Sequence, residues 1–130
     1  MTISNMKILI VDDEDLVREN LAAYCEDEGF DVISADSGEK ALELLKNHRF
    51  DIGIIDMRLP GIDGNAVIHQ AHLINARMKF LIHTGSTNYS LPQELINIGL
   101  SPGHVLRKPI SDMDRLLEKI IEISGTVENR

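Results

Sequence analysis

Five short aliphatic segments alternate with five longer amphipathic segments along this chain. The aliphatic segments are residues 7–11, 31–35, 51–56, 79–83 and 105–107. Continuous apolar runs of this kind are typical of strands that are buried on both faces of a parallel sheet. The intervening segments carry apolar residues at helical spacing and predict helices over residues 14–28, 37–48, 64–76, 90–98 and 112–124.

This alternation predicts the α/β fold class, as a single (βα)₅ domain with helices on both faces of a five-stranded parallel sheet. We expect the flavodoxin-like strand order 2-1-3-4-5, in which ligands bind beyond the carboxyl ends of the first and third strands. We expect residues 1–5 to be disordered or tag-like and residues 6–124 to form the domain. Residues 125–130 are expected to be a tail or the start of a linker.

Composition limits the kinds of partner that this chain can have. The net charge is −8, whereas direct nucleic-acid binding requires a basic surface that displaces counterions from phosphates. The longest purely aliphatic run, Ile8–Val11, is far too short to span a bilayer, and the single cysteine, Cys25, cannot form an internal disulfide. We therefore expect a cytoplasmic protein that binds neither nucleic acid nor membranes.

Polar residues follow four of the five predicted strands directly. Asp12 and Asp13 follow the first strand, Asp56 ends the third, Thr84 follows the fourth and Lys108 follows the fifth. Because the carboxyl ends of parallel strands meet at one edge of a sheet, these side chains are expected to converge. Three neighbouring carboxylates stay ionised readily when a cation lies between them, and Mg²⁺ suits such an all-oxygen site, with Mn²⁺ as a substitute.

This combination of groups favours phosphoryl transfer. A carboxylate such as that of Asp56 is a competent nucleophile toward phosphorus. Phosphoryl transfer otherwise needs positioning and neutralisation of charge. We expect Lys108 to pair with one phosphoryl oxygen and Thr84 to donate a hydrogen bond to another.

Four motifs of the sequence together resemble the response-regulator receiver family. They are ILIVDDE at residues 8–14, DIGIIDMRLPGIDG at residues 51–64, His83-Thr84-Gly85 and Lys108-Pro109. Each motif is weak alone, but all four occur in order and at suitable spacing. The resemblance runs from about Met6 to Ser124.

The resemblance implies specific roles for the residues of this site. Asp13 and Asp56 would bind Mg²⁺ directly, Asp12 would act largely through water, and the backbone carbonyl of Arg58 would complete the protein ligands. The phosphoryl donor would be a phosphohistidine on a histidine kinase or a histidine phosphotransfer protein. The protein would be a phosphoacceptor without a separate substrate, hence not an enzyme in the usual sense. The Lys108–Pro109 bond would be cis.

The resemblance also implies a conformational switch that regulates an output domain or a downstream protein. The message would leave through the fourth helix, fifth strand and fifth helix, where phosphorylated copies would also form a homodimer. Receivers usually carry Tyr or Phe three positions before the active lysine, and that ring moves inward with the threonine. Here the position is occupied by Val105, so Thr84 and Val105 are the expected switch residues and an aromatic gate is not expected. The fourth helix is rather apolar, which either core packing or a partner surface explains.

Two other functions fit parts of the sequence. A haloacid-dehalogenase-like phosphatase also uses Mg²⁺ and an aspartyl phosphate, but it needs a second acid two residues after its nucleophile. Arg58 occupies that position here. A degenerate receiver that acts only as a binding module is the other alternative, and the presence of every expected site residue argues against it. His69 and His72 lie one helical turn apart without an evident third metal ligand.

Overall fold

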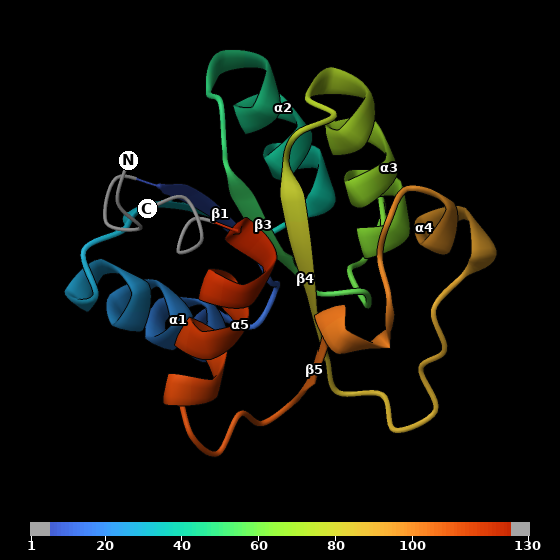
Figure 1. Cartoon of the computed structure of the whole chain (residues 1–130). Coiled ribbons are helices and arrows are strands. Elements are labelled where there is room, and N and C mark those ends of the chain that lie inside the picture. Colours follow the sequence, from blue (N-terminus) through green and yellow to red (C-terminus); the bar gives the residue numbers. More distant parts are fainter. Residues whose placement is uncertain (1–5, 126–130) are drawn as a thin grey trace.

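The computed structural model describes residues 6–125, so our expectations for residues 1–5 and 126–130 lie outside the described residues. A single sheet runs through the described part of the chain, and its five strands are parallel (Figure 1). The strands are β1 (Lys7–Val11), β2 (Asp31–Ala35), β3 (Ile52–Ile55), β4 (Lys79–Thr84) and β5 (Val105–Arg107). Their order is β2-β1-β3-β4-β5, which confirms the predicted flavodoxin-like topology.

The register of the strands brings their carboxyl ends to one edge of the sheet. Val11 of β1 lies opposite Ile55 of β3, so the residues that follow each of them are neighbours. Thr84 of β4 lies opposite Arg107 of β5, which places the next residue, Lys108, at the same edge. The register therefore carries side chains from four strands to one end of the domain.

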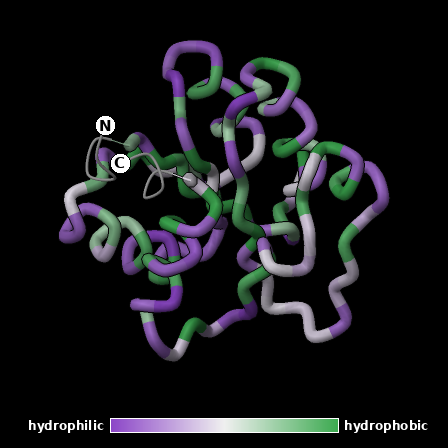
Figure 2. Tube along the Cα trace, in the orientation of Figure 1, coloured by the Kyte–Doolittle hydropathy of each residue, from purple (hydrophilic) through white to green (hydrophobic). Residues whose placement is uncertain are grey.

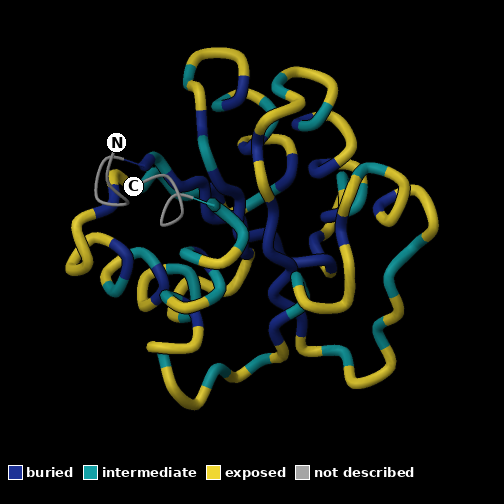
Figure 3. The backbone as a smooth tube through the Cα atoms, in the orientation of Figure 1, coloured by how far each residue is buried: buried dark blue, intermediate teal, exposed yellow. Residues whose placement is uncertain are grey.

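Alternate side chains of the sheet supply two separate cores. Leu9 and Val11 face a core that is covered by α2 (Gly38–Asn47), α3 (Gly64–Ile74) and α4 (Gln93–Asn97). Ile8 and Ile10 face the other core, which is covered by α1 (Asp15–Asp27) and α5 (Asp114–Ser124). The central strands are accordingly mostly apolar and buried (Figures 2 and 3), because helices cover both faces of the sheet there.

The ends of the helices follow the sequence signals only in part. Ser37, the first residue of the predicted helix, caps α2, since its side chain accepts a hydrogen bond from the backbone N–H of Lys40 at 3.1 Å. The sequence offers Ser111 or Asp112 as the cap of the last helix, and this prediction was wrong because neither residue occupies the N-cap position of α5. Met113 precedes the first helical residue of α5, and Asp112 instead accepts a hydrogen bond from the backbone N–H of Asp114.

The fourth helix is shorter than the predicted 90–98. Pro92 occupies the N-cap position with an extended backbone, and the chain before it follows no regular structure. This difference has a physical reason, because proline disfavours helical geometry in the residue that precedes it. A 3₁₀ turn at Pro102–His104, which the sequence did not predict, then leads into β5.

The helices α1 and α5, which cover the same face of the sheet, are joined by a polar contact. The hydroxyl of Tyr24 on α1 donates a hydrogen bond of 2.9 Å to Asp114 at the start of α5. Among residues 6–125, every helix is too short or too polar to cross a bilayer.

Candidate functional site

Three carboxylates meet at the carboxyl edge of the sheet. Asp12 and Asp13 follow β1, Asp56 follows β3, and ligand oxygens from the three side chains lie within 4.8 Å of one another. Asp12 is 1% exposed and Asp56 is 3% exposed, whereas Asp13 is open to solvent. The site therefore has two buried acids and one that water can reach.

Backbone hydrogen bonds hold this arrangement in place. The N–H of Asp56 donates to the carbonyl of Val11 at 2.9 Å, and the N–H of Lys108 donates to the carbonyl of Thr84 at 2.8 Å. These bonds continue the β1–β3 and β4–β5 ladders by one residue. The sheet therefore fixes the backbone positions from which the side chains of Asp56 and Lys108 extend.

Gly64 allows the first turn of α3 to lie directly against the loop that follows Asp56. A Cβ atom at this position would collide with the backbone carbonyl of Asp56 and with Met57. Glycine is therefore required by close approach of the two backbones.

Lys108 reaches into the acid cluster from β5. Its Nζ lies 2.7 Å from Glu14 Oε1, 3.0 Å from Asp12 Oδ2 and 3.3 Å from Asp56 Oδ2. Although burial disfavours the charged ammonium, hydrogen bonds to Glu14 and Asp12 and the charge of Asp56 raise the pKa of Lys108. The lysine is therefore a permanent cation that balances part of the negative charge of the site.

Asp12 shows the cost of burying a carboxylate in this position. Burial raises its pKa, against the backbone hydrogen bond from Glu14 and the contact with Lys108, both of which lower it. Its Oδ1 accepts the 2.9 Å hydrogen bond from the N–H of Glu14, while its buried Oδ2 lies 3.0 Å from the ammonium of Lys108. A buried oxygen with spare acceptor capacity, beside two further carboxylates, fits a hard cation such as Mg²⁺.

The remaining predicted site residues lie around this cluster. Thr84 is fully buried, and its hydroxyl oxygen accepts a hydrogen bond of 3.1 Å from the backbone N–H of Ser86. The N–H of Arg58 donates to Asp56 Oδ1 at 3.1 Å, and the Arg58 side chain is exposed. The Lys108–Pro109 peptide bond is cis, as the resemblance implies.

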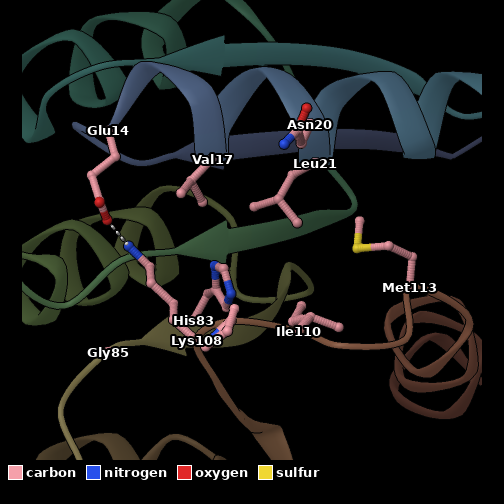
Figure 4. Close-up of a pocket in the computed structure, with 10 residues that line it drawn as sticks. Glu14, Val17, Asn20, Leu21, His83, Gly85, Lys108, Ile110 and Met113 are labelled. Carbon is pink, nitrogen blue, oxygen red and sulfur yellow. Dashed lines mark hydrogen bonds and ion pairs between the residues drawn. The ribbon is translucent and has the colours of Figure 1, made fainter.

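The structure also brings two residues to the site to which the sequence assigned no role. Glu14 forms the shortest of the three ion pairs of Lys108 (Figure 4), and His83 lies beside Asp12 with its Nδ1 3.9 Å from Asp12 Oδ2. Burial first, and the charge of Lys108 second, lower the pKa of His83 to about 4, so its ring is neutral near pH 7. The sequence did contain a signal for His83, because it is the one polar residue of the segment 80–83, whose other members are aliphatic or aromatic.

The neighbouring edge of the sheet is built differently. Val105 is half-buried on β5 and packs against the same core as Tyr89, a residue of the loop between β4 and α4. Arg107 of β5 donates hydrogen bonds to the backbone carbonyls of Ser86 and Tyr89, which ties this loop to the strand. The sequence did not single out Tyr89 or Arg107, because both contacts depend on the path of the loop.

Two minor predictions concern residues away from this edge. The spacing of apolar residues on the first predicted helix places Cys25 on its inward stripe, and Cys25 is indeed buried in the core beneath α1, where burial raises its pKa to about 12. His69 and His72 lie on α3, and within residues 6–125 no third potential ligand gathers with them into a metal cluster.

Comparison with known proteins decides the family. Residues 8–121 match the model of the response regulator receiver domain, which is most of the chain. The chain belongs to this family. It is a receiver domain of two-component signalling, and its five parallel strands have the order of that fold.

Individual relatives agree with this membership. The receiver domain is 32% identical over 95 residues to sporulation initiation phosphotransferase F of Bacillus subtilis, covering 73% of this chain and 77% of that protein. It is 31% identical over 106 residues to a cyclic di-GMP phosphodiesterase of Thermotoga maritima. That match covers 82% of this chain but only 28% of the relative, so the receiver domain corresponds to a minor part of that longer protein.

Solved structures give the same result. A CheY-like response regulator receiver domain protein from Methanospirillum hungatei superposes with a TM-score of 0.82 at 29% sequence identity. The superposition covers 95% of this chain and 97% of the other.

Proposed function

We propose that Asp56 accepts a phosphoryl group, in a Mg²⁺-dependent reaction, from a phosphohistidine on a histidine kinase or a histidine phosphotransfer protein. The observation that supports this most directly is the meeting of three carboxylates within 4.8 Å with the ammonium of Lys108. Such a cluster offers a nucleophile, a cation site and a fixed positive charge at one point of the receiver fold.

The acid cluster has the donor atoms that the metal needs. Asp12, Asp13 and Asp56, with the backbone carbonyl of Arg58, would hold Mg²⁺, or Mn²⁺ in its place. When bound, the ion supplies positive charge that offsets the carboxylates and the oxygens of an incoming phosphoryl group.

The side chains of the receiver domain would perform the transfer itself. A carboxylate oxygen of Asp56 forms a bond to phosphorus while the bond from phosphorus to the donor's imidazole nitrogen breaks. The electron pair of the broken bond stays on the imidazole. Lys108 already lies 3.3 Å from Asp56, so it is positioned to pair with a phosphoryl oxygen, and the hydroxyl of Thr84 donates to another.

Asp56→Asn tests the assignment of the acceptor. The protein is incubated with acetyl phosphate and Mg²⁺, and intact mass is followed over time. We expect the parent protein to gain one phosphoryl mass, only with the metal present, and Asp56→Asn to gain none. Asp63→Asn is a matched control, because it changes a cap of α3 and Asn caps helices as well as Asp does. Phosphoryl uptake by Asp56→Asn at the parent rate would refute the proposal.

The alternative of a haloacid-dehalogenase-like phosphatase has less support. The residue two positions after Asp56 is Arg58, whose side chain is exposed and offers no acid to protonate a leaving group. Sustained turnover of p-nitrophenyl phosphate would favour that alternative. One phosphoryl group per chain, without turnover, is expected for a phosphoacceptor and would also argue against a degenerate receiver.

We further propose that the phosphorylated domain regulates an output domain or a downstream protein through the face formed by α4, β5 and α5. Ile96 of α4 is 44% exposed there, which suits a partner or a second copy of the chain after phosphorylation. Because Val105 replaces the usual ring, this face would respond without the aromatic gate of the family.

Amide spectra with and without beryllofluoride, an analogue of the phosphoryl group, test this second proposal. We expect shifts at Thr84, at Val105 and along Gln93–Asn97. If the analogue binds at Asp56 while Val105 and Gln93–Asn97 keep their shifts, coupling through this face is refuted.

A further inference from the structure

A cavity of about 440 Å³ lies beside the acid cluster, between α1 and the segment that joins β5 to α5. Val17 and Leu21 of α1 form one wall, and Ile110 and Met113 form the opposite wall (Figure 4). The volume is that of a small-molecule site, and such sites combine apolar walls with a few polar groups.

His83 is the buried polar group of this cavity. Its side chain is 4% exposed, and neither ring nitrogen has a hydrogen-bond partner among the described residues. The 3.9 Å that separates Nδ1 from Asp12 Oδ2 is too long for a hydrogen bond. Leaving a buried polar group unpaired is unfavourable, so buried polar atoms are nearly always paired by protein, water or ligand.

The charges around the cavity select the kind of molecule that can pair with His83. The ammonium of Lys108 is already surrounded by Glu14, Asp12 and Asp56, so it has little attraction left for an anion. Glu14 is the other charged side chain that lines the cavity, and because it already pairs with Lys108 at 2.7 Å it has little attraction left for a cation. An uncharged molecule depends on neither attraction.

The geometry points to a binding site for a small uncharged ring compound that carries a hydroxyl group. The hydroxyl hydrogen-bonds to His83, and the ring packs between Val17 and Leu21 on one side and Met113 on the other. A hydroxyl is the simplest match, because it both donates and accepts and can pair with either nitrogen in either tautomer of the neutral imidazole.

Occupancy of this site has a consequence for phosphorylation. Lys108 lines the cavity and also contacts Asp56, so a bound molecule would lie against the lysine that neutralises a phosphoryl group. This consequence rests on the proposed function, whereas the binding itself does not. Binding is therefore tested on the protein without a phosphodonor.

The probe is 2-naphthol, titrated into the whole chain while amide shifts are recorded. We expect saturable shifts centred on Val17, Leu21, His83, Ile110 and Met113. The matched anion, 2-naphthoate, is expected to bind at least about tenfold more weakly, since its charge gains no free cation at the rim. His83→Leu replaces the imidazole with an apolar side chain of similar size and is expected to weaken 2-naphthol binding by about tenfold, the value of one hydrogen bond.

A second variant keeps the test decisive if His83→Leu does not fold. Val17→Phe fills the cavity from α1 and is expected to abolish the shifts. Shifts located elsewhere, equal affinity for 2-naphthol and 2-naphthoate, or unchanged affinity in a folded His83→Leu variant would each overturn the proposal. Absence of any saturable binding would also overturn it and would leave water as the partner of His83.

Discussion

Two regions of this domain differ in construction. One is the acid cluster beside β1 and β3, and the other is the lateral edge of the sheet, formed by β5 and α4. At the acid cluster, Asp56 and Lys108 are both held by backbone hydrogen bonds to neighbouring strands and by ion pairs. At the edge, β5 has three residues and α4 has five, and the loop before α4 is tied to the strand mainly by Arg107. The proposed chemistry therefore uses residues that backbone hydrogen bonds and ion pairs hold in place, while the proposed readout uses a short strand and a short helix.

The largest expected effect concerns Lys108, which tests whether the acid cluster works as one electrostatic unit. Lys108→Ala removes the fixed cation from beside Asp56, so phosphoryl uptake from acetyl phosphate should slow by about 10²–10³-fold, the usual effect of losing one such group. Binding of Mg²⁺ should persist, because the three carboxylates remain. Lys119→Ala is the control, since its only described ion pair is with the exposed Glu122. A rate within about threefold of the parent would show that the cluster does not depend on the lysine.

A second prediction separates the two regions by their response to pH, measured on metal-free protein. The pKa of His83 is lowered to about 4 in the folded state from an ordinary 6.5, so the unfolded state binds the extra proton first as pH falls. The contribution of neutral His83 to the stability of the folded state is fully present above pH 6.5 and is lost as pH falls to about 4. Its size is about 3 kcal/mol at most, offset in part by Asp12, whose raised pKa acts in the opposite direction.

Urea unfolding of the parent and of His83→Leu at several pH values measures this contribution. The difference in unfolding free energy between the two proteins should change steadily between pH 6.5 and pH 4. A difference that stays constant over this window would mean that His83 titrates normally in the folded protein.

The edge of the sheet is expected to respond more weakly. Arg107→Ala removes the hydrogen bonds to the carbonyls of Ser86 and Tyr89, which should cost about 1 kcal/mol of stability or less because the side chain is exposed. Amide exchange should quicken over residues 85–92, while uptake of phosphoryl by Asp56 stays within about twofold. Arg77→Ala, at an exposed position far from the loop, serves as the control. A large change in uptake would mean that the edge controls the acid cluster directly.

The smallest effect is expected from Glu14→Gln. Glu14 is exposed, and although its contact with Lys108 lowers its pKa, exposed ion pairs contribute little. The rate of phosphoryl uptake should change by less than about twofold in either direction. A stronger effect would show that Glu14 restrains Lys108 before phosphorylation and belongs to the acid cluster in function as well as in position.

Much of the fold and of the candidate site could be predicted from the sequence. The apolar runs predicted all five strands to within a residue or so, because a strand buried on both faces admits few polar side chains. Asp12, Asp13, Asp56, Thr84 and Lys108 could be placed together because parallel strands end at one edge. The extent of α4 was wrong, since the helical spacing of apolar residues from 90 to 98 was outweighed by Pro92.

What the sequence by itself determined was the five strands, the two apolar faces and the residues at the strand ends, all of which follow from local periodicity and from the position of each strand's last residue. Only the tertiary structure decided that Glu14 pairs with Lys108, that Arg107 holds the loop at Tyr89, and that His83 is buried beside a cavity with no hydrogen-bond partner from residues 6–125. These features arise where α1, β4 and the chain before α5 approach one another. The burial and the pKa of a side chain depend on neighbours that lie far away in the sequence, and no local pattern specifies them.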